Sequence, residues 1–165
     1  MAKRQVFYSF HFGNDVMRVQ QIRHMGLVEG NTPVSVNDWE SIKKSDAGVE
    51  RWIDDNMKGT SCVVVLIGSE TYSRKWVKYE IKKAWKDGKA LLGIHIHNIN
   101  CPNTKTCAKG TNPFAAFEFK QGGRTFSPAV YDPKATDAYG EIKNNLGKWI
   151  EAAIAQRKPV LRPFP

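Results

Sequence analysis

Apolar and polar positions along the chain follow two alternating periods, which predict strands and helices in turn. Gln5–Phe10 is rich in aromatic and β-branched residues and predicts a first strand. Cys62–Ile67 is a continuous apolar run, typical of a parallel strand that is buried on both faces. Lys89–His97 and Pro128–Tyr131 predict two further strands, and Pro33–Val36 predicts a short, weaker one.

The helical period appears between these strands. Four segments place apolar residues three or four positions apart, so each predicts a helix with one face toward a core. The first predicted helix runs through Val16, Val19 and Ile22 and ends near Gly26, and the second runs from Ser45-Asp46 to Gly59 with Val49, Trp52, Ile53 and Met57 inside. The third is capped by Ser69 and runs to about Lys86. The fourth runs from about Thr136 to Gln156 and packs through Ile142, Leu146, Trp149, Ile150 and Ile154.

This alternation along the whole chain predicts an α/β fold of flavodoxin-like type, with a five-stranded parallel sheet and helices on both faces. We expect one domain over residues 1–156, followed by a proline-containing C-terminal tail over residues 157–165, because proline cannot continue a helix. Prolines and glycines interrupt the stretch from Asn98 to Phe126, which is expected to be a long irregular loop.

Composition narrows the setting in which the protein works. The chain has 165 residues, of which 41% are hydrophobic, and this is enough for one domain with a full core. It shows neither a signal-peptide pattern nor an apolar run of membrane-spanning length. Three cysteines are an odd number, and Cys62 lies in a predicted buried strand, which does not indicate a disulfide framework. We therefore expect a cytoplasmic protein without a membrane partner.

The formal net charge of +9 raises the question of a nucleic-acid partner. The basic residues are scattered except for one row at near-helical spacing, which is more often a solvated helix face. No zinc-finger or RNP-type signature accompanies this row, so a nucleic-acid partner is not expected, and the charge suits an anionic dinucleotide equally well. The row consists of Arg74, Lys75, Lys78, Lys82, Lys83, Lys86 and Lys89.

Several kinds of site are excluded because their motifs are missing. The sequence contains no G-x-G-x-x-G, no Walker loop and no G-x-S-x-G elbow. His95, His97, Cys101 and Cys107 have side chains that suit zinc, but the spacing H-x-H-x3-C-x5-C matches no common structural zinc site. We therefore expect free thiols and no bound metal, with zinc as the alternative.

A carboxylate falls on the core side of the third predicted helix. At about 100° per residue, Glu80 lies between Trp76 and Ala84. Burying an unpaired carboxylate costs several kcal/mol or raises its pKa. One interpretation is a partly exposed structural residue that pairs with Lys83 or Arg74. The other is a functional residue, because an indole beside a carboxylate can hold a sugar and stabilise positive charge on it.

Two segments match motifs of a known family. Val6–Asp15 is similar to the motif V-F-x-S-F-R-G-x-D, with His11 where an arginine is usual. Trp76 and Glu80 match a W-x-x-x-E pair that follows a strand ending in Gly-Ser, and Asp38–Glu40 adds to the likeness. With these motifs in this order, the chain resembles TIR domains, specifically the bacterial TIR-like group that includes the NAD-consuming signalling subunit of the Thoeris antiphage defence system.

The resemblance implies an enzyme, an NAD glycohydrolase or ADP-ribosyl cyclase that breaks the nicotinamide–ribose bond. Glu80 is implied as the catalytic residue, which would bind ribose hydroxyls and stabilise developing positive charge. NAD is then the substrate, so no cofactor and no metal are expected. Ser69 is implied to lie near a phosphate at a helix N-terminus. The residues implied to bind the substrate are Phe10, His11, Trp39, Ser69 and Trp76.

The implied biological role is the production of a cyclic ADP-ribose-type signal in antiphage defence. A separate effector protein, activated by this cyclic nucleotide, would be the partner, and self-assembly would accompany activation. The alternative is a non-enzymatic TIR-like module for protein interaction and signalling, which the unusual His11 favours.

Overall fold

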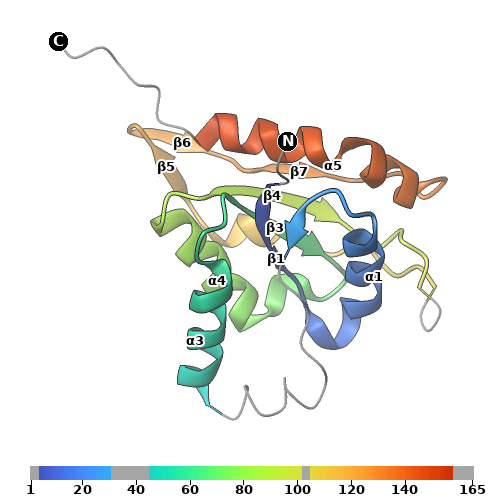
Figure 1. Cartoon of the computed structure of the whole chain (residues 1–165), viewed down its shortest axis with the longest axis horizontal. Coiled ribbons are helices and arrows are strands. Elements are labelled where there is room, and N and C mark those ends of the chain that lie inside the picture. The colour runs from blue at the N-terminus through green and yellow to red at the C-terminus, as the bar shows by residue number, and fades with distance from the viewer. Residues whose placement is uncertain (1–3, 31–44, 102–104, 158–165) are drawn as a thin grey trace.

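The fold is described from a computed structural model, over residues 4–30, 45–101 and 105–157. Its centre is a parallel sheet of five strands in the order β2-β1-β3-β4-β7 (Figure 1). The predicted α/β fold with a five-stranded parallel sheet is therefore confirmed. The strands in this order are Glu29–Gly30, Gln5–Ser9, Cys62–Ile67, Ala90–His95 and Ala129–Tyr131.

Helices cover both faces of the sheet, which gives three layers (Figure 1). Helices α1 and α5 pack on one face, and α3 and α4 pack on the other. Because both faces are covered, β3 and β4 are buried along their whole length, as their apolar runs predict. The helices are α1 Phe12–His24, α3 Asp46–Met57, α4 Lys75–Lys86 and α5 Ala138–Arg157, with the 3-10 turns η1 Thr71–Ser73 and η2 Pro113–Ala116.

Alternate strand residues divide between two hydrophobic cores. Val64 packs on the side of α1 and α5, whereas Val65 packs on the side of α3 and α4. The same alternation in β1 sends Tyr8 to the first side and Phe7 to the second. Ser9 shares the parity of Phe7, so it belongs to the side of α3 and α4.

The start of the third predicted helix was wrong. Ser69 does not cap α4, which begins at Lys75 after the N-cap residue Arg74. The backbone N–H of Gly68 instead donates to the Thr71 hydroxyl at 2.8 Å, and this hydrogen bond closes a tight turn that leads into η1. The helix therefore starts five residues later than a cap at Ser69 predicts.

The stretch expected to be one irregular loop contains regular structure. It includes η2 and an antiparallel hairpin of β5, Phe119–Gln121, and β6, Arg124–Phe126. Gly122 and Gly123 both have positive φ, which only glycine adopts readily, and they form the two-residue turn. A glycine pair between two short runs was the signal for this hairpin.

Three predictions involve residues that the structure does not describe. The weak strand Pro33–Val36 lies outside the described residues, and β2 is the strand described next to β1 at that edge of the sheet. The motif Asp38–Glu40, with Trp39, also lies outside them, as do residues 158–165 of the predicted tail. Within the described residues, no helix is both long and apolar enough to cross a membrane. No disulfide links the three cysteines.

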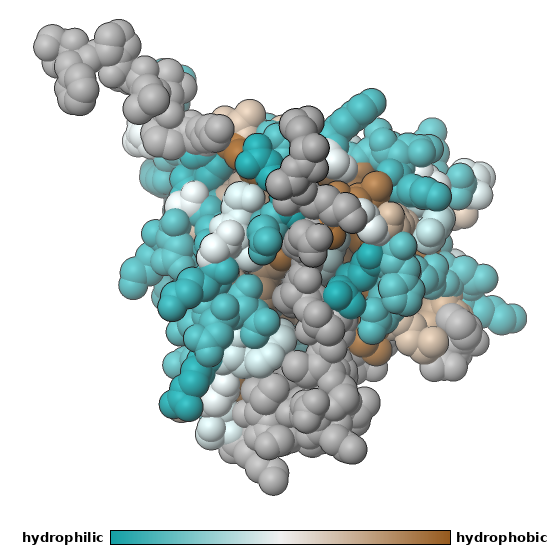
Figure 2. All heavy atoms as spheres, in the orientation of Figure 1, coloured by the Kyte–Doolittle hydropathy of each residue, from teal (hydrophilic) through white to brown (hydrophobic). Residues whose placement is uncertain are grey.

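The basic row on α4 does not form an uninterrupted positive surface. Lys75 pairs with Asp46 of α3 at 2.6 Å, and Lys83 lies 3.6 Å from Asp54 and 3.1 Å from Asp87. Acidic and basic side chains therefore lie next to one another on α3 and α4. The surface on this side of the molecule is largely hydrophilic, as its teal colour shows (Figure 2). This mixture agrees with a solvated helix face.

The end of α5 is fastened to α4 and the hairpin through one guanidinium group. Arg157 donates to the Trp85 carbonyl at 2.8 Å, to the Lys89 carbonyl at 3.2 Å and to Oε1 of Gln121 at 2.7 Å. Its guanidinium also lies 3.6 Å from the centre of the Trp85 ring. A planar fork with several donors suits this arrangement, and an ammonium group does not.

We predict that Arg157→Ala lowers the free energy of unfolding by about 2 kcal/mol, because it removes charged hydrogen bonds and a cation–π contact. Arg157→Lys should recover less than half of this loss. Urea unfolding curves measure both changes, with Lys148→Ala on the exposed side of α5 as the matched control. Equal stability of Arg157→Ala and the wild type would contradict the fastening role.

Candidate active site

Glu80 lies in the middle of α4 and faces the sheet. Glu80 is 6% exposed, and the other buried residues of the helix are Val77, Ile81 and Ala84. The predicted position on the core side of the helix is therefore confirmed. A carboxyl group thus occupies a place in the α3–α4 core where an apolar side chain would be expected.

The carboxyl group of Glu80 accepts a hydrogen bond from a hydroxyl group at the end of the first strand. Ser9, the last residue of β1, donates a hydrogen bond of 2.6 Å from its Oγ to Oε1 of Glu80. Ser9 is fully buried, so the bond forms away from bulk water. It joins the carboxyl end of a central strand to the middle of α4.

Burial dominates the acidity of this group. It raises the pKa of Glu80 to about 8, while the hydrogen bond from Ser9 acts in the opposite direction. At neutral pH the group is therefore mostly a neutral carboxylic acid. A positive charge nearby would lower its pKa and favour the ionised form.

The structural interpretation, in which a partly exposed Glu80 pairs with Lys83 or Arg74, is wrong. Lys83 pairs with Asp54 and Asp87, and Arg74 lies 3.6 Å from the Glu70 carboxylate. These basic groups therefore have acidic neighbours at the surface, and Glu80 is not a partly exposed member of their network.

Trp76 lies one helical turn before Glu80, at the spacing that places two side chains on neighbouring parts of one helix face. The indole is half-buried and packs edge-on against Tyr79, with ring centres 5.5 Å apart. The Lys75 ammonium lies 4.8 Å from the centre of the indole ring. These two neighbours hold the indole, and its contact with substrate stays a prediction.

Three further residues predicted to bind the substrate are described, and they follow the carboxyl ends of β1 and β3. Phe10 packs against the α1–α5 core, so the structure does not bring it onto the same face as Glu80. His11 is half-buried, with Nδ1 at 3.9 Å from Oε2 of Glu70, and burial lowers its pKa. Ser69 follows β3 and is half-buried, and no α-helix begins there, so Ser69 does not stand at the helix N-terminus that was expected, while its contact with a phosphate stays a prediction. Their contacts with substrate remain predictions.

A buried ion pair that sequence analysis missed supports this edge. Asp15 and Arg18 of α1 are both fully buried and lie 3.2 Å apart. Arg18 also donates to the carbonyl of Ile99 at 3.0 Å and to that of Lys105 at 2.7 Å, so it ties α1 to the loop after β4. The signal was the i, i+3, i+4, i+7 spacing that places both residues beside Val19 on one helix face.

Close packing extends from this ion pair to the turn after β3. A side chain at Gly68 would collide with the Asp15 carboxylate, and one at Gly110 would collide with the Gly68 carbonyl. Burial raises the pKa of Asp15 to about 6, although Arg18 favours its charged form. The turn beside the Glu80 site is therefore held from both α1 and the segment before η2.

The four residues considered for zinc do not form a metal site. Within residues 4–30, 45–101 and 105–157, no group of three or more His, Cys, Asp or Glu residues could hold a metal ion. The rings of His95 and His97 are nearly buried, with centres 5.8 Å apart, and burial lowers the pKa of both. This arrangement of the described residues does not support the zinc alternative.

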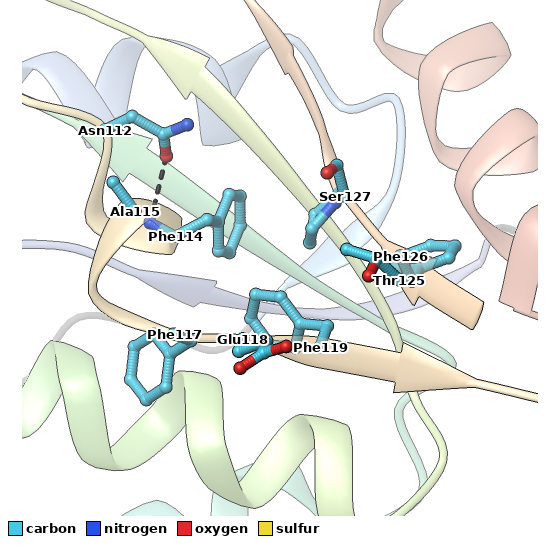
Figure 3. A pocket seen from close by; sticks show the side chains of 10 residues that line it. Asn112, Phe114, Ala115, Phe117, Glu118, Phe119, Thr125, Phe126 and Ser127 are labelled. Atoms are coloured by element: carbon cyan, nitrogen blue, oxygen red, sulfur yellow. Dashed lines mark hydrogen bonds between the residues drawn. The ribbon is translucent and has the colours of Figure 1, made fainter. Parts of the chain in front are cut away.

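A pocket of about 230 Å³ lies away from Glu80, between η2 and the β5–β6 hairpin (Figure 3). Four phenylalanine side chains contribute to its wall, and the Asn112 amide oxygen at its edge accepts from the backbone N–H of Phe114 at 2.9 Å. Of the predicted site residues that the structure describes, none lines this pocket. Its lining residues are Asn112, Phe114, Ala115, Phe117, Glu118, Phe119, Thr125, Phe126, Ser127 and Pro128.

Comparison with known proteins agrees with the motifs at this edge. Residues 7–100, more than half of the chain, match the family described as "Thoeris protein ThsB, TIR-like domain". A protein of Bacillus cereus (strain MSX-D12), named "Putative cyclic ADP-D-ribose synthase ThsB1", is 37% identical over 132 residues, which cover 75% of this chain and 68% of that protein. The chain belongs to the TIR-like domain family of the Thoeris protein ThsB.

We predict that Glu80→Gln changes stability in a pH-dependent way. Glutamine keeps an oxygen for the Ser9 hydroxyl but carries no charge. Because burial raises the folded-state pKa from 4.5 to about 8, the neutral acid contributes stability that is fully present below about pH 4.5 and is lost as pH rises through about 8. Urea unfolding should therefore give equal stabilities near pH 4 and a variant that is more stable by about 2–4 kcal/mol near pH 9.

The matched control for this prediction is Glu118→Gln, because Glu118 is an exposed carboxylate on the hairpin segment. Its replacement should leave the pH dependence of stability as in the wild type. A Glu80→Gln variant whose stability follows the wild-type curve at every pH would show that this carboxyl group is not desolvated.

Proposed function

We propose that this protein cleaves NAD at the bond between nicotinamide and ribose and makes a cyclic ADP-ribose-type signal. The observation that carries the proposal is the buried carboxyl group of Glu80, held by Ser9 at the carboxyl edge of the parallel sheet. Ligands of doubly wound sheets bind beyond this edge. The name of the Bacillus cereus relative, a cyclic ADP-D-ribose synthase, supports the same reaction class.

The proposed reaction breaks one bond and forms one bond. The electron pair of the nicotinamide–ribose bond leaves with the nicotinamide ring nitrogen, and the ribose carbon develops positive charge. The Glu80 carboxylate stabilises this charge and binds ribose hydroxyls. A nucleophilic atom of the same molecule then captures the carbon and gives up its proton, which closes the cycle. If water captures it instead, the product is ADP-ribose.

The raised pKa of Glu80 fits this substrate. The nicotinamide ring of NAD is cationic, and an opposite charge nearby favours the ionised form of a carboxyl group. Substrate binding would therefore convert the neutral acid into the carboxylate that the transition state needs. An empty site would keep the group neutral and avoid an unpaired buried charge.

The resemblance also supports a biological setting for this reaction. A Thoeris protein would act in antiphage defence, in the cytoplasm where NAD is available, and its cyclic product would activate a separate effector protein. Self-assembly would be part of activation. The residues proposed to contact NAD besides Glu80 are Phe10, His11, Trp39, Ser69 and Trp76.

We predict that Glu80→Gln lowers the rate of nicotinamide release by about 100-fold or more, because it removes the charge that stabilises the transition state. Chromatography of nicotinamide after incubation with NAD measures this rate, with the wild type assayed also in its assembled state. Glu118→Gln is the control and should keep the wild-type rate. Equal release by Glu80→Gln and the wild type would rule out the proposed catalytic residue.

Mass spectrometry of the product tests the cyclising step separately. We expect a cyclic ADP-ribose isomer as the main product, because a nucleophilic atom of the bound molecule competes with water for the same ribose carbon. ADP-ribose as the sole product would show a glycohydrolase activity and contradict the proposed cyclase activity. Protection against phage that survives Glu80→Gln would instead favour the non-enzymatic interaction module.

A further inference from the structure

The hydrogen bond between Ser9 and Glu80 connects two residues that lie 71 positions apart in the chain. In the family resemblance Ser9 is one residue of the motif Val6–Asp15, which is implied to lie at the same site as Glu80, but it has no individual role there. Both residues are nearly or fully inaccessible to water, so the hydroxyl group replaces the solvent that an exposed carboxyl group would have.

Ser9 sits on a rigid part of the fold. It is paired with Val65 of β3 in the parallel ladder, and β1 lies between β2 and β3 in the sheet. A serine has one hydroxyl proton, and this proton points to Oε1 of Glu80. The strand therefore fixes one oxygen of the carboxyl group and with it the orientation of the whole group.

We propose that Ser9 is a positioning residue that aims the carboxyl group of Glu80 and stabilises its ionised form. This inference rests on the proposed function for its catalytic meaning, because Glu80 is the residue through which Ser9 acts. The physical effect of the hydroxyl group on Glu80 does not depend on NAD and is measurable without it.

The charges around Glu80 leave the hydroxyl group as the main stabilising influence on the carboxylate. On α4, Lys83 is paired with acidic neighbours, and the Lys78 ammonium lies over the Tyr72 ring at 5.2 Å from its centre. At the strand edge, the Glu70 carboxylate lies near both His11 and Arg74. Within the described part of the chain, burial and the Ser9 hydrogen bond are the two causes that shift the pKa of Glu80.

A donor that points at a carboxylate favours the charged form, so its removal raises the pKa. We expect Ser9→Ala to raise the pKa of Glu80 by about one unit, a typical effect of losing one hydrogen bond to a charged group. Ser9→Thr keeps the hydroxyl group on a β-branched side chain suited to a strand and should restore a pKa near the wild-type value.

The direct experiment is a carbon-detected NMR titration of the full chain with labelled glutamate carboxyl groups. The signal that disappears in Glu80→Gln identifies Glu80. The control is Ser73→Ala, because Ser73 carries an exposed hydroxyl group that donates to the Glu70 backbone carbonyl at 3.1 Å. An unchanged Glu80 titration in Ser9→Ala, or an equal shift in Ser73→Ala, would overturn the proposal.

The catalytic consequence appears in the pH profile of kcat/KM. With a pKa of about 8, roughly one tenth of Glu80 is ionised at pH 7, and with a pKa of about 9 roughly one hundredth is ionised. Relative to the wild type, Ser9→Ala should therefore lose about tenfold in kcat/KM at pH 7, about fivefold at pH 8 and about twofold at pH 9. A loss that is the same at every pH would mark a purely structural residue and overturn the positioning role.

Two outcomes are separable. If the wild type does not cleave NAD in any state, the proposed function fails, while the NMR titration still decides whether Ser9 controls Glu80. If Ser9→Ala does not fold, Ser9→Cys replaces it, because a thiol has a similar size but is a weak donor. The pKa of Glu80 should then rise as expected for alanine, and an unchanged pKa would overturn the proposal.

Discussion

The buried hydrogen bond between Ser9 and Glu80 is the interaction on which the site depends. A carboxyl group in an otherwise apolar helix face opposes folding unless it stays neutral or finds a donor. The Ser9 hydroxyl at the end of β1 supplies that donor at 2.6 Å, and burial keeps the acid mostly neutral. The apolar residues beside it on α4 offset the remaining unfavourable free energy.

The fold holds this pair in place from several sides. β1 is a central strand, so Ser9 cannot move without disturbing the sheet. The ion pair of Asp15 and Arg18 fastens α1 to the loop after β4, and Gly68 allows the next turn to approach the Asp15 carboxylate. A parallel sheet thus provides a rigid edge, and one functional carboxyl group is placed on it.

Much of the fold could be predicted because its signals are local. The apolar run of β3 and the spacing in α5 predicted both elements, and the helical wheel alone placed Glu80 on the core side. Its partner Ser9 could not be predicted from periodicity, because the contact depends on sheet order across 71 positions. The helix start predicted at Ser69 was wrong because the hydrogen bond from Gly68 to Thr71 forms a turn where a capped helix was expected.

The central claim is that Glu80 is a desolvated acid that ionises when the cationic nicotinamide ring of NAD arrives. The most direct measurement is the pKa of Glu80 in the wild type, by carbon-detected NMR, without ligand and with a non-cleavable NAD analogue. The account predicts a pKa near 8 in the free protein, a fall with the cationic analogue, and no fall with reduced NADH, whose nicotinamide ring is neutral. A pKa near that of an exposed glutamate in the free protein, or one that the cationic analogue does not lower, would contradict it.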